Sequence, residues 1–95
     1  MRVVLSRRAH TDLRNIWHYT ATHWSEEQAD RYVAQVHDTL AALAQNSFLG
    51  SGSEELGPDY RKHRAGSHVI FFRREADIIR IVRVLHQSMD FKRHL

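Results

Sequence analysis

The sequence predicts an α+β fold of order β-α-α-β-β-β, in which a helix hairpin packs on one face of a small, antiparallel-rich sheet. Three observations predict it. An apolar stripe at helical spacing runs from residue 9 to residue 44, a capping motif at Ser25 divides this stripe in two, and three strand-like segments follow residue 60. With 95 residues, the chain is long enough for one domain, residues 1–95, and not for two.

The N-terminal part contains the opening strand and both helices. Residues 2–5 are typical of a short strand, and Ser6 is placed to cap a first helix of roughly four to five turns. Ser25-Glu26-Glu27-Gln28 is a capping box that begins the second helix, and Trp24 and Ala29 are spaced as a hydrophobic staple. Because no spacer separates the helices, they must form an antiparallel hairpin. We expect Trp17 and Trp24 in the core, with these apolar positions of the stripe: Ala9, Leu13, Ile16, Ala29, Tyr32, Val33, Val36, Leu40, Leu43 and Ala44.

The C-terminal part is predicted to be a meander. Residues 46–60 hold three of the four glycines and the single proline, which predicts a loop. Strands are expected over residues 61–65, 68–73 and 78–85. Gly66-Ser67 suits a type II′ turn, and residues 74–77 form a second tight turn. The last ten residues are expected to be a short helix or a loose tail.

The third strand of this meander is apolar but contains Arg80 and Arg83, and His86 follows at its end. We expect Arg83 on the strand face shared by Ile79, Ile81 and Leu85. Burying an arginine is costly unless its charge is paired. This strand therefore either meets a carboxylate of the same chain or presents a basic surface to an acidic partner.

Charge is distributed unevenly along the chain. Residues 1–60 hold five Arg/Lys and eight Asp/Glu, a net −3, whereas residues 61–95 hold nine and three, a net +6. This asymmetry predicts an anionic partner for the C-terminal part. The absence of cysteine excludes disulfides and thiolate zinc sites and indicates a reducing compartment. No apolar run approaches a membrane span and no leader opens the chain, so we expect a cytoplasmic protein without membrane contact.

An ordered set of residues resembles the ParE branch of the RelE/ParE toxins of type II toxin–antitoxin systems, nearly end to end. The best single piece is Arg83-Val84-Leu85-His86 with Asp90 four residues later. One departure is Ser47, where the family usually has proline. The other matching positions are Val4-Leu5-Ser6, Ala9, Asp12-Leu13, Ile16, Tyr19, Trp24, Gln28-Ala29, Tyr32, Leu43-Ala44, Gly50, Leu56, Arg61 and His68-Val69-Ile70-Phe71-Phe72.

The resemblance implies a toxin that acts on DNA gyrase and is held inactive by a cognate ribbon-helix-helix, ParD-like antitoxin in a hetero-oligomer. Nucleic acid would be contacted only indirectly, because the antitoxin of such systems binds the operator. RelE-type relatives with the same fold instead cut messenger RNA on the ribosome, which leaves an alternative function, because fold does not decide activity.

The residues favour an inhibitor over this ribonuclease alternative. Metal-free RNA cleavage needs a base, an acid and cations for the phosphorane charge. No tyrosine follows Tyr60 and no glutamate follows Glu75, so the set is incomplete. We therefore assign no catalytic residue and no cofactor. The groups that could loosely fill such roles are Arg61, Arg64, Arg73, Arg83, His86 and His94.

Two binding surfaces are expected. An acidic, amphipathic segment of the antitoxin would fold into the groove between helix hairpin and sheet, where its carboxylates would meet Arg61, Arg64, Arg73, Arg80 and Arg83. For gyrase we nominate the basic C-terminal region, formed by Arg83, His86, Lys92, Arg93 and His94.

Each of these groups also has a structural interpretation. Arg83 could pair with Asp90 or with an acid from the helices, and His86 could cap backbone groups. Arg61, Lys62 and Arg64 could be a solvated sheet edge. We assign no metal site, because the spacings among His10, His18 and His23 do not give the one-face pair of a four-residue step.

Overall fold

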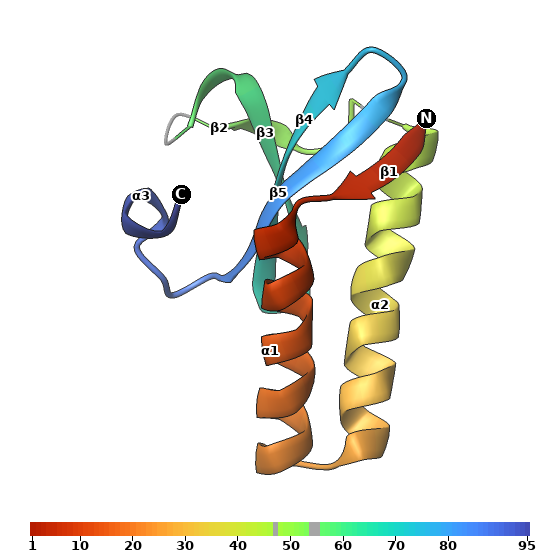
Figure 1. The fold of residues 1–95 in the computed structure, drawn as a ribbon, viewed down its shortest axis with the longest axis vertical. Coiled ribbons are helices and arrows are strands. Elements are labelled where there is room, and N and C mark those ends of the chain that lie inside the picture. Colours follow the sequence, from red (N-terminus) through yellow and green to blue (C-terminus); the bar gives the residue numbers. More distant parts are fainter. Residues whose placement is uncertain (47, 54–55) are drawn as a thin grey trace.

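The computed structural model describes residues 1–46, 48–53 and 56–95, so Ser47 lies outside the described residues. Two long helices cover one face of a five-stranded sheet (Figure 1), which confirms the predicted α+β class. The strand order is β1-β5-β4-β3-β2, with β1 parallel to β5 and all other pairs antiparallel. Along the chain the elements are β1 (Arg2–Leu5), α1 (Arg7–His23), α2 (Glu26–Gln45), β2 (Ser51–Ser53), β3 (Gly57–Ala65), β4 (His68–Glu75), β5 (Ile78–His86) and α3 (Phe91–His94).

Both long helices begin at the predicted caps. The Ser6 hydroxyl accepts a hydrogen bond from the backbone N–H of Ala9, and the Ser25 hydroxyl accepts one from Gln28, each at 3.0 Å.

The placement of Trp24 in the core is wrong. This residue is 62% exposed at the turn between the helices, and its ring lies 6.3 Å from that of Tyr19. None of the helices of the described chain is long and apolar enough to cross a membrane.

The core lies between the helix hairpin and the sheet. It is built from apolar side chains that recur every three or four residues on the helices and every second residue on the strands. Burying such side chains is the main favourable term in folding, at about 25 cal/mol for each Å² of apolar surface. The buried members are Ala9, Leu13, Ile16, Val36, Leu40, Leu43, Ala65, Ile70, Phe72, Ile79, Ile81 and Val84.

A β-bulge in β5 changes which side of the sheet Arg83 occupies. Phe72 pairs with Ile81, but Phe71 pairs with Arg83, so Val82 is the extra residue. Beyond the bulge the alternation of faces is reversed. Arg83 therefore lies on the face opposite Ile81, and its predicted position beside Ile79 and Ile81 is wrong.

Helix α1 covers the edge that β5 would otherwise expose. Strand β1 pairs with β5 only as far as Ile81, which leaves the last residues of β5 without a strand partner on that side. The Ser6 hydroxyl donates to the carbonyl of Val82 at 2.8 Å, and the Asp12 carboxylate accepts from the N–H of Val84 at 2.9 Å. Two side chains thus satisfy backbone groups at this edge.

The loop predicted over residues 46–60 is wrong in part. Strand β2 and the first residues of β3 fall within it, and β2 pairs with Gly57, Arg61 and Lys62 of β3. Strand β3 consequently has a neighbour on both sides, so it is not the solvated edge considered for Arg61 and Lys62. The last residues form the short helix α3, one of the two expected outcomes.

Candidate partner-binding surface

The side of the sheet opposite α1 and α2 contains a row of basic side chains around an apolar centre. We call it the open face. Directly paired residues of an antiparallel sheet share one face, so the ladder places Phe71 beside Lys62 and Arg83, and Arg73 beside Tyr60 and Arg80. The paired residues of the three central strands on this face are Tyr60, Lys62, Arg64, Val69, Phe71, Arg73, Glu75, Ile78, Arg80, Arg83 and Leu85.

At one end of the open face, two arginines share one carboxylate. Arg73 donates from Nε to Glu75, and Arg80 donates to the other oxygen of that carboxylate at 2.9 Å. The hydrogen bond from Arg80 and that from Arg73 hold the pKa of Glu75 below its usual range, and the bond to Glu75 raises the pKa of Arg73. Positive charge therefore exceeds negative charge at this end of the face.

Near the other end, Arg83 forms a bidentate ion pair with Asp12 of α1. Both guanidinium–carboxylate distances are 2.8 Å, and the two side chains are only 11% and 10% exposed. The hydrogen bond that Arg83 donates to Asp12 raises the pKa of Arg83. The expectation that an acid from the helices pairs with Arg83 is confirmed, and that acid is Asp12.

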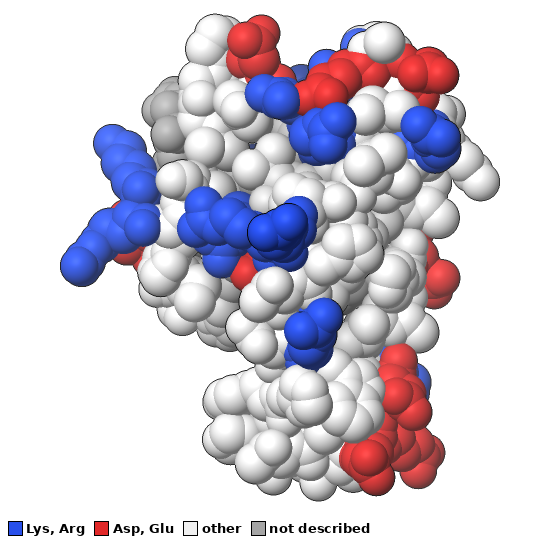
Figure 2. Space-filling view, viewed as in Figure 1, with Lys and Arg blue, Asp and Glu red and all other residues white. Residues whose placement is uncertain are grey.

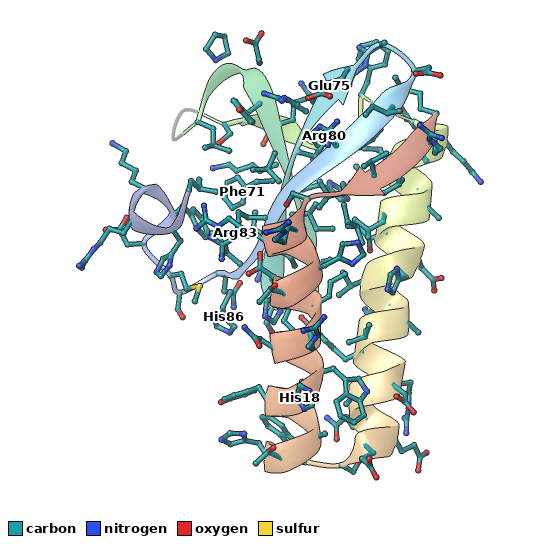
Figure 3. The ribbon with its side chains drawn as sticks, viewed as in Figure 1. His18, Phe71, Glu75, Arg80, Arg83 and His86 are labelled. Carbon is teal, nitrogen blue, oxygen red and sulfur yellow. The ribbon has the colours of Figure 1, made fainter. Side chains whose placement is uncertain are left out.

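The C-terminal segment folds back onto the open face. The ring of Phe91 packs edge-on against the buried Phe71 with 4.8 Å between ring centroids. Arg83 and Arg8 both donate to the backbone carbonyl of His94, Arg8 at 2.7 Å. Figure 3 shows Arg83 between the first turn of α1 and α3, close to Phe71. Residues from both ends of the chain thus anchor α3.

On the helix side of the sheet, His68 and His86 face each other across β4 and β5. Their ring centroids are 5.2 Å apart, and the Tyr32 hydroxyl of α2 lies 2.6 Å from Nδ1 of His68. Burial, helped by the neighbouring His86 and opposed by Asp12, lowers the pKa of His68 to about 4. The Nδ1 atom of His86 accepts from the N–H of Ser88 at 3.1 Å, so His86 does cap a backbone group. Among the residues that the structure describes, no three His, Asp or Glu side chains are grouped to hold a metal ion.

The residues predicted to bind the antitoxin lie on both faces of the sheet. Arg64, Arg73, Arg80 and Arg83 lie on the open face. Arg61 pairs with Phe72 and so lies on the helix side, where it donates to the carbonyls of residues 48 and 50 at 2.9 and 2.8 Å. Arg61 therefore fastens the segment before β2.

The residues predicted to contact the target also lie on different parts of the molecule. Lys92 and Arg93 are exposed on α3, and Figure 2 shows basic side chains projecting at the left edge of the molecule, where α3 lies in Figure 1. The backbone of His94 accepts the two hydrogen bonds that hold α3, whereas His86 lies on the opposite side of the sheet. The exposed cations of α3 and the paired Arg83 are thus distinct parts of one surface.

Sequence reasoning missed two residues that shape this surface, Asp12 and Arg8. Asp12 stands between Ala9 and Leu13 in the apolar stripe, and a carboxylate at such a position indicates a buried cationic partner. This signal was available in the sequence. Nothing in the sequence marks Arg8, because its acceptor is a backbone carbonyl 86 residues away.

Comparison with known proteins decides the family. The family described as "ParE toxin of type II toxin-antitoxin system, parDE" matches residues 3–91. The chain belongs to this family. It is therefore a ParE toxin of a type II toxin–antitoxin system, as the resemblance predicted.

Similar proteins match the ParE-family chain over nearly its whole length. Toxin ParE1 of Caulobacter vibrioides is 42% identical over 91 residues, covering 96% of this chain and 94% of that protein. Toxin ParE1 of Mycobacterium tuberculosis is 39% identical over 95 residues, covering 99% and 97%. The fold matches a solved chain titled "Chromosomal ParDE TA system from P. aeruginosa", with a TM-score of 0.79 at 23% identity, over 90% of this chain and 95% of that one.

Proposed function

We propose that this ParE-family toxin acts in the cytoplasm, inhibits DNA gyrase by protein–protein contact, and is neutralised by a ParD-like antitoxin. Membership of the family supports an antitoxin partner. The excess of positive charge on the open face supports this face as the antitoxin-binding site. There, Arg73 and Arg80 share the carboxylate of Glu75.

In this proposal an acidic antitoxin segment folds onto the open face. It does not enter the predicted groove between helix hairpin and sheet, because Arg64, Arg73, Arg80 and Arg83 lie on the other side of the sheet from the helices. Arg64 donates to two neutral acceptors, the carbonyl of Gly66 and the amide oxygen of Gln87, and can exchange them for a carboxylate. The segment would also cover the apolar centre around Phe71. Arg83 would not pair with a carboxylate of the antitoxin, because Asp12 already pairs with it. It would contribute indirectly, by holding the backbone of His94 and so α3 in place.

The antitoxin site is tested by charge reversal. Arg73→Glu combined with Arg80→Glu should weaken antitoxin binding at least tenfold, as measured by calorimetry, because the carboxylates of the segment would then meet like charges. Arg14→Glu, an exposed reversal on α1, is the matched control. Equal loss in the control, or no loss in the double variant, would contradict the proposal.

Gyrase contact is assigned to the exposed end of α3. Lys92 and Arg93 are exposed, and the anchored carbonyl of His94 fixes their position on the surface. Lys92→Glu with Arg93→Glu should abolish inhibition of supercoiling while antitoxin binding persists. If this variant still inhibits supercoiling, α3 does not contact gyrase.

The arrangement of these groups supports inhibition over RNA cleavage. His86 lies on the face opposite Arg73 and Arg80, so this histidine and these two cations do not converge on one substrate position. Its neighbour His68, with a pKa lowered to about 4, is also a poor general base at neutral pH.

A further inference from the structure

The end of the helix hairpin carries an exposed aromatic cluster that the core does not use. We call it the hairpin tip: Tyr19, His23 and Trp24, with Glu26 and Glu27 beside them at the start of α2. Tyr19 and Trp24 are 59% and 62% exposed. Large exposed aromatic groups that lie together mark interaction sites more often than isolated ones do.

The rings of the hairpin tip are already ordered. Tyr19 and His23 stack with 3.9 Å between centroids and 24° between ring planes, and Trp24 lies 6.3 Å from Tyr19 and 6.1 Å from His23. The Nδ1 atom of His23 lies 2.8 Å from the carbonyl of Tyr19, which fixes the ring further. A partner would therefore lose little side-chain entropy on binding.

The charges beside the rings are mainly negative. Glu26, Glu27 and Asp30 lie in the first turns of α2, and Arg31 pairs with Glu27 in an ion pair whose side chains are 74% and 84% exposed. Figure 2 shows these acidic side chains beside the lower end of the hairpin, away from the basic residues of α3. Such a surface repels anionic lipid and attracts a partner rich in lysine and arginine.

We propose that the hairpin tip is a second docking surface for gyrase and contacts a basic patch of that enzyme. This inference rests on gyrase being the target. An enzyme that binds DNA must present lysine and arginine to phosphates. Arginine stacks on tyrosine and tryptophan and pairs with carboxylates, so exposed rings followed by Glu26 and Glu27 in the first turn of α2 fit such a patch. The proposal gives the toxin two contacts, one basic at α3 and one acidic at the hairpin tip.

The test measures binding to purified gyrase at low and at high salt. Trp24→Ser and Tyr19→Ser should each weaken binding at least tenfold, and Glu26→Lys with Glu27→Lys should weaken it and reduce its salt dependence. Phe48→Ser is the matched control, because Phe48 is an exposed aromatic residue, 70% exposed, outside the hairpin. Thermal melts verify folding, which removal of exposed side chains should leave intact.

The possible failures are distinguishable. If the unaltered protein binds gyrase and the tip variants bind equally well, the tip is not a docking surface, although the target stands. If the tip variants lose antitoxin binding, the surface belongs to the antitoxin and the inference is overturned. If the unaltered protein does not bind gyrase, the target assignment fails, and the tip as its docking surface fails with it.

Discussion

The ion pair between Asp12 and Arg83 allows a quantitative prediction. Asp12 pairs with the guanidinium of Arg83 and accepts a hydrogen bond from the N–H of Val84. Asp12→Ala removes both interactions at once. Arg83, 11% exposed, would keep its charge without a carboxylate, and the edge of β5 would lose an acceptor.

The magnitude follows from the burial of the pair. Removing one partner of a buried ion pair costs about 3–5 kcal/mol. Because both side chains keep some contact with water, we expect the lower end of this range, about 3 kcal/mol. That is a large part of the roughly 5–15 kcal/mol that stabilises a small domain. Adding Arg83→Leu removes the orphaned charge and should recover about 2 kcal/mol of this loss.

Urea unfolding followed by tryptophan fluorescence measures these changes. Asp38→Ala, which removes an exposed carboxylate from α2, is the matched control and should change the free energy of unfolding by less than about 0.5 kcal/mol. The reasoning is refuted if Asp12→Ala costs less than about 1 kcal/mol, or if the second substitution adds its own loss instead of recovering part of the first.

Three further predictions concern other parts of the fold. Gly66 has φ +58°, and a Cβ there would lie 2.7 Å from the Tyr32 hydroxyl, so Gly66→Ala should cost about 2 kcal/mol in urea unfolding, whereas Gly52→Ala should be nearly neutral. Burial lowers the pKa of His68 from 6.5 to about 4, so the unfolded chain binds a proton that the folded one does not. The free energy of unfolding is therefore unaffected by His68 above pH 6.5 and decreases as the pH falls toward 4, by about 1–2 kcal/mol after allowance for solvent screening. His68→Asn should remove this decrease from the pH profile of stability. Phe91→Ala should expose the C-terminal segment to limited proteolysis with a stability loss of only about 1 kcal/mol; unchanged resistance would show that the ring does not hold α3.

Features set by neighbouring residues were predictable from the sequence. The caps at Ser6 and Ser25 depend on hydrogen bonds across three residues, and the turn at Gly66 depends on a positive φ, which glycine adopts without strain. The helix hairpin and the meander followed from these local signals. The Gly/Ser-rich strand β2 was missed because its pairing with β3, and not its composition, makes it a strand.

Features that depend on distant pairing were not predictable. The bulge at Val82 is visible only once β4 and β5 are aligned, and it alone moves Arg83 to the open face. The acidity of Asp12 within an apolar stripe indicated a buried partner, but that partner lies 71 residues away. Trp24 was placed in the core by its type and spacing, whereas the turn between the helices directs it outward.

The central claim is that this toxin inhibits gyrase by contact through its surface and does not cleave RNA. The most direct measurement is supercoiling by purified gyrase with increasing amounts of the protein, beside a ribosome-dependent messenger-cleavage assay with the same preparation. We predict inhibited supercoiling, intact message, and relief of inhibition when the cognate antitoxin is added. Cleaved message with unaffected supercoiling would contradict the account and direct attention to His86 and Arg83 as catalytic candidates.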